Sequence, residues 1–136
     1  MKPLGRLERQ AERVAKRRAR GAAGRVAGRR AEVLAAVWLM LKGYRILGFR
    51  LRTPQGEIVL LAQRGGVLAV VEVKRRQTLD LALETVSPAQ RDGLRRAGAA
   101  IASRRPSLQN LAVRLDLVAL APGRLPIHSP DAWRGA

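Results

Sequence analysis

The chain lacks cysteine and has little histidine or aromatic content. Its 136 residues include no cysteine, one histidine (His128) and 3% aromatic residues. The missing cysteine excludes disulfides and thiolate zinc sites, and a single histidine excludes an imidazole-rich metal centre. So few aromatic side chains do not supply the stacking platforms that are typical of single-strand binders. Any contact with nucleic acid is therefore expected mainly at backbone phosphates, with an affinity that falls steeply with salt.

Long hydrophobic runs are also missing. The longest charge-free apolar run covers residues 33–41, whereas a helix that crosses a bilayer takes about 20 residues. The basic N-terminus is not followed by an apolar segment with a small-residue cleavage site, so no secretory signal is expected. The sequence therefore predicts a soluble, cytoplasmic protein without stable membrane insertion.

Acidic residues are scarce beside basic ones. The chain has 27 Lys and Arg against 10 Asp and Glu, a formal net charge of +17. Residues 1–30 hold 11 basic and 2 acidic groups (+9), and residues 31–136 hold 16 and 8 (+8). A field of this sign attracts polyanions, with nucleic acid first and an anionic membrane second.

Residues 1–24 are expected to form a basic N-terminal arm, helical or disordered, ahead of one domain over residues 25–136. The arm's basic residues recur at spacings of three and four, which places them on one stripe of a helix. They are Arg6, Arg9, Arg13, Lys16, Arg17 and Arg20. The arm either lies along phosphates or an anionic membrane, or is a solvated extension, because isolated helices are marginal in water.

The domain begins with a helix over residues 25–42, which Gly43 ends. Between Ala31 and Leu41 every residue except Glu32 is apolar. This pattern predicts a helix that is buried nearly all round, against a sheet or several partners. Strands over 44–52, 57–63 and 67–74, joined by short turns, predict an antiparallel meander.

A second helix is expected from Ser87 and Pro88, because Gln90 completes a capping box. The apolar stretch 112–120 then predicts a strand that pairs in parallel through the helical crossover. The tail is loop-rich, with Trp133 as an anchor onto the body. The fold class that follows is α/β, with a mixed sheet of about four or five strands flanked by helices.

Glu72 and Lys74 lie on one face of the third strand, because side chains alternate along a strand. A charged pair in an apolar strand costs desolvation energy unless it is paired or used. Arg supplies 23 of the 27 basic residues, so a lysine here departs from the habit of this chain. Lysine can shift its pKa and act as a compact donor. Taken alone, the pattern favours a plain ion pair at the end of a strand, because Glu-x-Lys matches many surface strands by chance.

Short motifs in a fixed order give the pattern more weight. They are Gly28-Arg29-Arg30-Ala31-Glu32, Leu41-Lys42-Gly43-Tyr44-Arg45-Ile46-Leu47, Gly56-Glu57-Ile58, Val70-Val71-Glu72-Val73-Lys74, Val86-Ser87-Pro88, Arg114-Leu115-Asp116, and Ile127-His128 up to Trp133. From about Gly24 to Trp133 the chain is similar to the YraN-like family of bacterial proteins, whose fold resembles that of restriction endonucleases and Holliday-junction resolvases. The resemblance implies a restriction-endonuclease-like domain.

The same resemblance implies a site of carboxylates and a lysine. In that superfamily, acids on neighbouring strands hold Mg²⁺ (or Mn²⁺), which activates a water, while the lysine orients the water and offsets phosphate charge. Carried over residue by residue, the helix acid is Glu32, the strand acid is Glu72 and the lysine is Lys74. These three are the expected catalytic residues.

The chain departs from the family pattern at position 59. The family's Gly-Glu-Ile-Asp ends in a metal-binding Asp, where this chain has Val59. Glu57 shares the strand face but lies two residues away, or about 6.6 Å along the strand, so it is not expected to replace the missing ligand simply. Three interpretations stay open. They are a nucleic-acid-binding protein with impaired or absent catalysis, a Mg²⁺-dependent endonuclease with a weakened metal set of Glu72, Glu57 and Glu32, and a membrane-surface or scaffold protein.

Basic residues around the expected site are the candidates for phosphate contacts with structured or double-stranded DNA. Arg75 and Arg76 directly follow Lys74, and other candidates lie on the second helix and at the start of the first. These are Arg91, Arg95, Arg29 and Arg30. Arg114 and Asp116 share a strand face, which predicts an ordinary ion pair. His128 is either a general base or, as the proline-rich loop around it favours, a structural residue.

Overall fold

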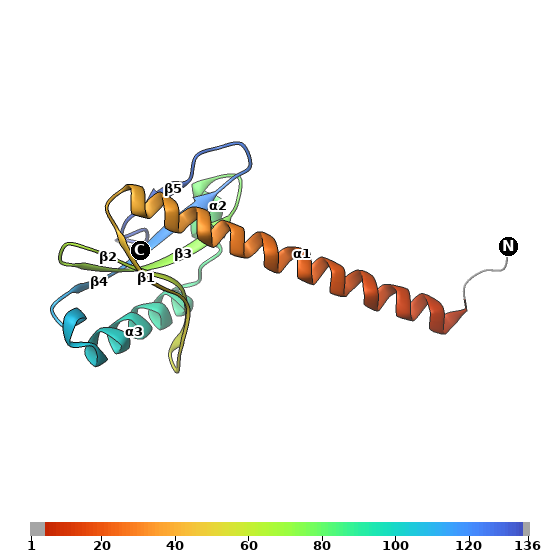
Figure 1. Ribbon diagram of the computed structural model, residues 1–136, viewed down its shortest axis with the longest axis horizontal. Coiled ribbons are helices and arrows are strands. Elements are labelled where there is room, and N and C mark those ends of the chain that lie inside the picture. Colours follow the sequence, from red (N-terminus) through yellow and green to blue (C-terminus); the bar gives the residue numbers. More distant parts are fainter. Residues whose placement is uncertain (1–4, 135–136) are drawn as a thin grey trace. The chain divides into compact units, whose positions relative to one another are not determined.

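The computed structural model of the chain describes residues 5–134 (Figure 1). Residues 1–4 of the expected arm lie outside the described residues. The elements are α1 (Arg6–Leu41), β1 (Arg45–Thr53), β2 (Gly56–Arg64), β3 (Val67–Arg75), α2 (Leu79–Glu84), α3 (Pro88–Arg104), the 3-10 helix η1 (Pro106–Leu108), β4 (Ala112–Leu120) and β5 (Ile127–Ser129).

The strands form one five-stranded mixed sheet in the order β1-β2-β3-β4-β5. β1, β2 and β3 pair antiparallel, β4 joins β3 in parallel, and β5 lies antiparallel to β4. The parallel pair requires a crossover, which α2 and α3 provide. The predicted α/β class, with a mixed sheet of about five strands flanked by helices, is confirmed.

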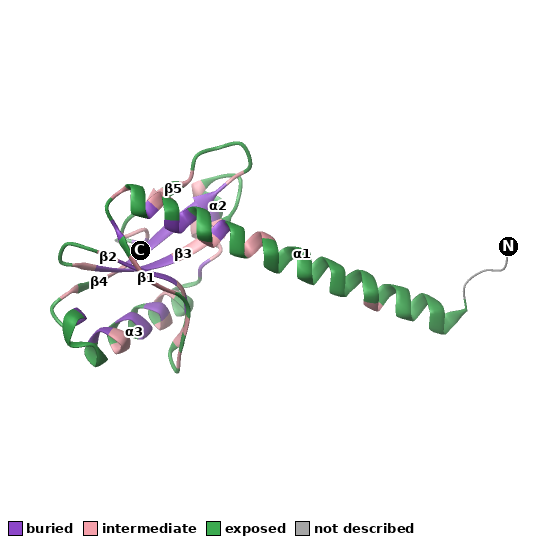
Figure 2. Ribbon diagram, viewed as in Figure 1, coloured by how far each residue is buried: buried purple, intermediate pink, exposed green. Residues whose placement is uncertain are grey.

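Two apolar clusters hold the helices to the sheet (Figure 2). On one face, Leu94 and Ala97 of α3 pack with Leu68, Val70 and Leu115 of the central strands. The helix approaches the sheet closely at Gly98, where an added Cβ would lie 2.6 Å from Val70 Cγ2. The absence of a side chain there lets α3 lie flat on the strands that carry Glu72 and Lys74.

The other cluster uses the C-terminal part of α1. Ala31, Ala35 and Leu39 pack with Leu60 and Val71. Small alanines let the helix backbone come close to the sheet, and the cluster holds Glu32, which neighbours Ala31, near the sheet.

The expectation that residues 31–41 are buried all round was wrong. One face of this part of α1 is in the core, and the other is open. The apolar side chains on the open face are 43–77% exposed, namely Val33, Leu34, Val37, Met40 and Leu41. Among the described residues, this part of α1 is therefore covered on one face only.

α1 runs unbroken through Gly24, whereas the sequence predicted a helix from Arg25. Contacts divide the chain into Met1–Arg30 and Ala31–Ala136, and each unit is described by itself. In the first unit, the Glu8 carboxylate accepts a hydrogen bond from the Gly5 N–H at 2.8 Å, and Glu12 pairs with Lys16 at 3.4 Å. An acid near the N-terminus and an i,i+4 pair both favour a helix.

The second helix begins as its sequence predicts. The Ser87 side chain accepts from the Gln90 N–H and the Gln90 side chain accepts from the Ser87 N–H, which is the expected capping box. Trp133 is buried, and its Nε1 donates to the Leu83 carbonyl at 3.2 Å, so its predicted anchoring role is confirmed. Among the described residues, no helix has the length and apolarity that a membrane span requires.

Candidate functional site

The central strands β2 and β3 separate at one end of the sheet. Their pairing runs from Arg64 opposite Val67 to Leu60 opposite Val71. Beyond that pair, β2 continues beside β1, with Ile58 opposite Leu51, while β3 continues beside β4. We call the region where the strands part, residues 56–59 of β2 and 72–75 of β3, the fork. The three strand residues that the sequence assigned to the site, Glu57, Glu72 and Lys74, all lie in the fork.

A cavity of about 490 Å³ lies in the fork, under the first turns of α3. Its lining includes the candidate side chains Glu57, Glu72 and Lys74, and also Val59. Val86 before α3, residues of α3 itself and the turn between β1 and β2 complete the lining, namely Val86, Ala89, Gln90, Gly93, Leu94, Gln55 and Gly56. The strands and the helix therefore bring together residues that the sequence placed on one face only by alternation.

Glu72 and Lys74 form the predicted pair in the cavity. Lys74 Nζ lies 3.4 Å from Glu72 Oε1, and the Lys74 and Glu72 side chains are 27% and 13% exposed. Burial raises the pKa of Glu72, the Lys74 ammonium lowers it, and the carboxylates of Glu32 and Glu57 raise it again. The balance leaves the pKa of Glu72 above its ordinary value. Three carboxylates are thus close enough to interact at the fork.

Glu32 of α1 does not line the cavity, although its charge acts on Glu72, and it is already engaged. Both of its carboxylate oxygens accept hydrogen bonds from Arg50, at 3.0 Å from Nε and 2.9 Å from Nη2. The hydrogen bonds and charge of Glu32 raise the pKa of the Arg50 guanidinium above its ordinary value. Arg50 belongs to β1, between Phe49 and Leu51, which pair with Leu60 and Ile58. This register sets Arg50 across from Val59.

The residues present do not fit a Mg²⁺ site as they stand. Across residues 5–134, no three His, Cys, Asp or Glu side chains gather in an arrangement that could hold a metal ion. Mg²⁺ requires oxygen ligands in near-octahedral geometry. Val59 offers no oxygen, Glu32 is held by Arg50, and Glu57 is half exposed with Arg52 at 3.8 Å. Glu32, Glu57 and Glu72 share an electrostatic environment without forming a coordination shell.

The candidate phosphate contacts fall in several places. Arg75 and Arg76 are exposed just beyond Lys74, and Arg95 is exposed on α3. Arg91 is half-buried, with its guanidinium carbon 5.8 Å from the centre of the Trp133 ring. Its cation–π contact anchors the C-terminal tail, so less of Arg91 faces solvent than of Arg95. Arg29 and Arg30 are exposed in the N-terminal unit.

A buried polar network lies on the α1 side of the sheet and centres on Asp116, which is fully buried. Its carboxylate accepts from Arg114 Nε and Nη2 at 2.7 and 2.8 Å, from the Asp131 N–H at 3.0 Å, and pairs with His128 Nε2 at 2.9 Å. Burial alone would raise the pKa of Asp116, but these hydrogen bonds lower it below its ordinary value. The predicted ion pair of Arg114 and Asp116 is confirmed.

The network extends to two residues of the motif Leu41–Leu47, to which sequence reasoning assigned no role. Arg114 Nη2 donates to the Tyr44 hydroxyl at 2.6 Å, and Lys42 Nζ lies against Nδ1 of His128. Reasoning from sequence missed Lys42 and Tyr44 in this network and Arg50 at the fork. Lys42 and Tyr44 follow a helix end, and Arg50 sits among other arginines, so no local spacing marks them. Only the tertiary fold brings them to their partners.

The fold and the site together define the class of protein. It is a small α/β protein with a mixed sheet, and its central strands separate around a cavity that a glutamate and a lysine line. The family model described as "Uncharacterised protein family UPF0102" matches residues 31–120. The chain therefore belongs to the UPF0102 family, which confirms the resemblance to YraN-like proteins. The match includes every acid and lysine of the fork.

Individual relatives support the same assignment. A UPF0102 protein of Caulobacter vibrioides (strain NA1000 / CB15N) is 66% identical over 120 residues, covering 88% of this chain and 96% of the relative. One from Caulobacter sp. (strain K31) is 68% identical over 122 residues, covering 90% and 88%. UPF0102 protein amb4503 of Paramagnetospirillum magneticum is 52% identical over 111 residues, covering 79% and 86%.

Proposed function

We propose that this protein binds structured or double-stranded nucleic acid through backbone phosphates, on a nuclease-like scaffold whose metal-dependent cleavage is impaired or absent. The observation that carries the proposal is the state of the fork. Val59 takes a place in the cavity beside Glu72 and Lys74 without offering an oxygen ligand, and Glu32 is tied to Arg50. A phosphodiester would meet a lysine and an acid there, but no complete metal site.

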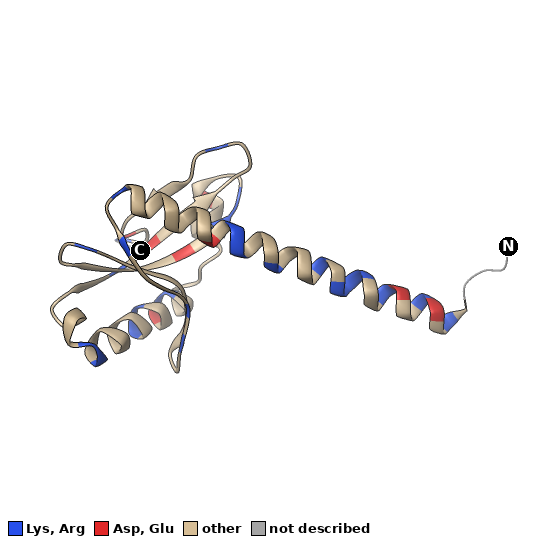
Figure 3. Cartoon of the chain, viewed as in Figure 1, with Lys and Arg blue, Asp and Glu red and all other residues tan. Residues whose placement is uncertain are grey.

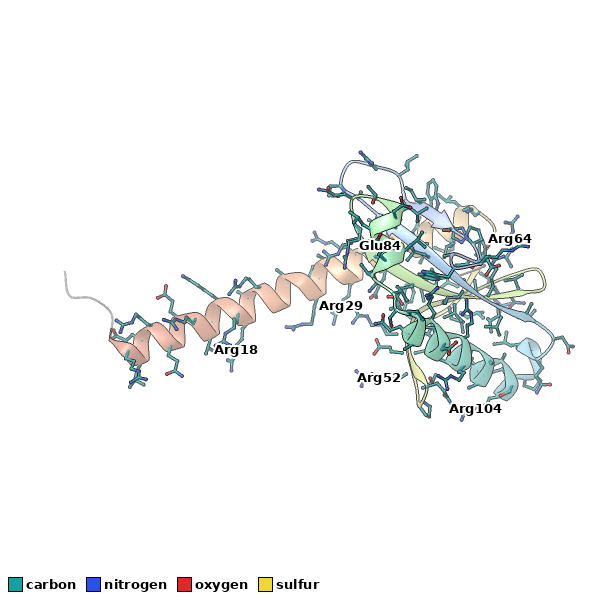
Figure 4. The ribbon with its side chains drawn as sticks, turned by 180° about the vertical axis from the view of Figure 1, so that it is seen from behind. Arg18, Arg29, Arg52, Arg64, Glu84 and Arg104 are labelled. Atoms are coloured by element: carbon teal, nitrogen blue, oxygen red, sulfur yellow. The ribbon has the colours of Figure 1, made fainter. Side chains whose placement is uncertain are left out.

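Charge supports the binding part of the proposal. Lys and Arg recur along α1 and α3, and both units of the chain are basic (Figure 3). Arg18 and Arg29 stand out from α1, and Arg52 and Arg104 lie at the surface of the other unit (Figure 4). Tyr44 and Trp133 are buried and so are not open to stacking on bases, whereas Phe49 is 42% exposed. A surface with many arginines and few exposed aromatic side chains favours contact with phosphates over contact with bases.

The chemistry of phosphodiester hydrolysis explains why position 59 matters. Hydrolysis needs an activated water and positive charge against the phosphate that is attacked. Lys74 is one positive charge, and Glu72 beside it offsets that charge. Without a bound divalent ion, the fork has no net positive charge to offer the reaction. Binding can continue on the surrounding arginines while cleavage is lost.

A second candidate, a Mg²⁺-dependent endonuclease that uses Glu32, Glu57, Glu72 and Lys74, is favoured by one observation. Glu57 lines the same cavity as Glu72 and Lys74. In this mechanism Glu57 would have to supply the ligand that Val59 lacks, and Glu32 would have to leave Arg50. Lys74 would then orient the attacking water.

Cleavage assays separate the two candidates. Wild type, Lys74→Ala and Val59→Asp are incubated with linear, branched and single-stranded DNA in Mg²⁺ or Mn²⁺. The proposal expects no cleavage by wild type and nicking by Val59→Asp, because an Asp restores an oxygen ligand beside Glu72. Cleavage by wild type that is lost in Lys74→Ala would instead establish the endonuclease.

Binding is tested apart from cleavage, by fluorescence anisotropy with duplex DNA at several salt concentrations. We expect binding that weakens steeply with salt and that survives Glu72→Ala, because removal of an acid does not remove a phosphate contact. Asp92→Ala, which removes an exposed acid from α3, is the matched control. Absence of binding at low salt would refute the proposed function.

A further inference from the structure

Arg50 has a backbone conformation that is unusual for its residue type. Its φ is 51°, in the left-handed region that a side chain with a Cβ rarely adopts. Such residues persist where surrounding contacts fix them, and they cluster at functional sites. The residue occurs within β1, across from Val59, so the unusual backbone lies at the level of the fork.

The contact that accompanies this conformation is the two-pronged pair with Glu32. The guanidinium group of an arginine matches both carboxylate oxygens, and such charge-assisted pairs are the strong ones. The Glu32 side chain is 12% exposed, whereas that of Arg50 is 42% exposed. The arginine therefore reaches inward from the surface to satisfy an acid that is mostly enclosed.

The two acids of the fork itself also have cations of the chain beside them. Glu72 has Lys74 at 3.4 Å and Glu57 has Arg52 at 3.8 Å. Three carboxylates thus face three cations of the chain, and the formal charge of the set is zero. A divalent ion is attracted to carboxylates that lack a counter-charge, and in this fork each of the three has one.

We propose that Arg50 is the counter-cation that takes the place of a divalent ion at Glu32, so that the fork works as a metal-independent site. The inference deepens the proposed function, since it assigns the loss of metal binding to two residues, Val59 and Arg50. Val59 removes a ligand and Arg50 occupies another. Restoring the ligand alone leaves Glu32 engaged, and both changes are needed for tight metal binding.

The test is a calorimetric titration of Mn²⁺ into full-length protein without nucleic acid. The variants are wild type, Val59→Asp, and Val59→Asp combined with Arg50→Asn. Asn is chosen because it tolerates a left-handed backbone and is too short and uncharged to hold Glu32 as arginine does. The control combines Val59→Asp with Arg45→Asn, which removes the same charge from an exposed residue at the other end of β1.

We expect no saturable Mn²⁺ binding by wild type and weak binding by Val59→Asp. Arg50→Asn should tighten the binding of Val59→Asp by at least about tenfold, because it frees both Glu32 oxygens and removes a positive charge that repels the ion. The Arg45→Asn control should match Val59→Asp alone, and a further Glu32→Gln change should remove the gain. Thermal melts verify that each variant is folded.

Equal Mn²⁺ affinity with and without Arg50→Asn would overturn the inference, as would tight binding by wild type. If Val59→Asp combined with Arg50→Asn does not fold, Val59→Asp combined with Arg50→Gly takes its place, because glycine adopts a left-handed backbone without strain. A gain in Mn²⁺ affinity over Val59→Asp then supports the inference, and no gain overturns it. The titration contains no nucleic acid. A result that refutes the role of Arg50 therefore leaves the proposed DNA binding untouched, and a failure of DNA binding leaves the role of Arg50 untouched.

Discussion

Glu72 and Asp116 are both enclosed by protein, yet their surroundings shift the two pKa values in opposite directions. Around Glu72, burial outweighs the attraction of Lys74, and the nearby Glu32 and Glu57 carboxylates add to its effect. Around Asp116, the hydrogen bonds from His128 and Arg114 outweigh burial. A buried acid whose pKa is raised because its charge is incompletely compensated is typical of a functional position. A buried acid whose hydrogen bonds lower its pKa is typical of a structural one.

The raised pKa of Glu72 predicts how stability depends on pH. Between the ordinary value of 4.5 and the higher folded value, the folded protein holds a proton that the unfolded chain releases, so stability falls as pH rises. We expect Glu72→Gln to remove this fall and to raise the Tm at pH 7. Melts from pH 4 to 8 measure it, with the exposed Glu84→Gln as control. An unchanged pH profile in Glu72→Gln would contradict the prediction.

The lowered pKa of Asp116 has the opposite consequence. Its contribution to stability is complete above the unfolded pKa of about 4 and is lost as pH falls through the lower folded pKa. Asp116→Ala should cost roughly 3 kcal/mol at pH 7, because it strands Arg114 and His128 in a buried network. Urea unfolding at pH 7 measures this, and Asp92→Ala should change stability by less than about 0.5 kcal/mol. Equal effects of the two changes would sink the prediction.

Single residues also set the limit of what the sequence could predict at the site. Strand alternation is enough to place Glu72 and Lys74 together, and the departure at Val59 is visible in the motif. The left-handed conformation of Arg50 has no sequence signal. The pair of Glu32 and Arg50 is also not visible in the sequence, because it joins a helix to a strand. The same holds for Lys42 and His128, which lie 86 positions apart.

At the scale of elements, local signals were reliable where they were strong. The capping box at Ser87 marked the start of α3, and β-branched alternation indicated the strands. α2 and β5 were not predicted, because elements of six and three residues carry too little periodicity to recognise. The burial of α1 was overestimated because an apolar run does not reveal how many of its faces will be covered.

The two faces of α1 should respond differently to truncation. Leu39 is fully buried in the sheet-facing cluster, whereas Leu34 is 57% exposed on the open face. Leu39→Ala should cost about 2–5 kcal/mol, and Leu34→Ala should stay within about 0.5 kcal/mol, since it leaves no cavity. Urea unfolding of the two variants provides a matched comparison. A large cost at Leu34 would mean that the open face is covered in solution.

At the scale of the whole molecule, composition and motif order were more informative than any single residue. The basic charge, the mixed sheet and the family followed from the sequence because each is spread over many positions. The separation of β2 and β3 did not follow, since it depends on where a ladder of hydrogen bonds ends, and the strand pattern is the same on both sides of that point.

Because the positive charge is divided between both units, matched charge removal can locate the residues that hold the phosphates. One variant changes Arg75, Arg76 and Arg95 to Gln, and the other changes Arg13, Arg17 and Arg20 to Gln, so each removes three charges. For each phosphate that the variant no longer neutralises, the slope of log affinity against log salt should become shallower by about 0.9. If the surface beside the fork binds the phosphates, the slope of the first variant should be shallower by about two to three units, and its affinity should fall below that of the second. Weakened binding confined to the second variant would place the phosphates on residues 1–30, because the fork would then take no part in holding the polyanion.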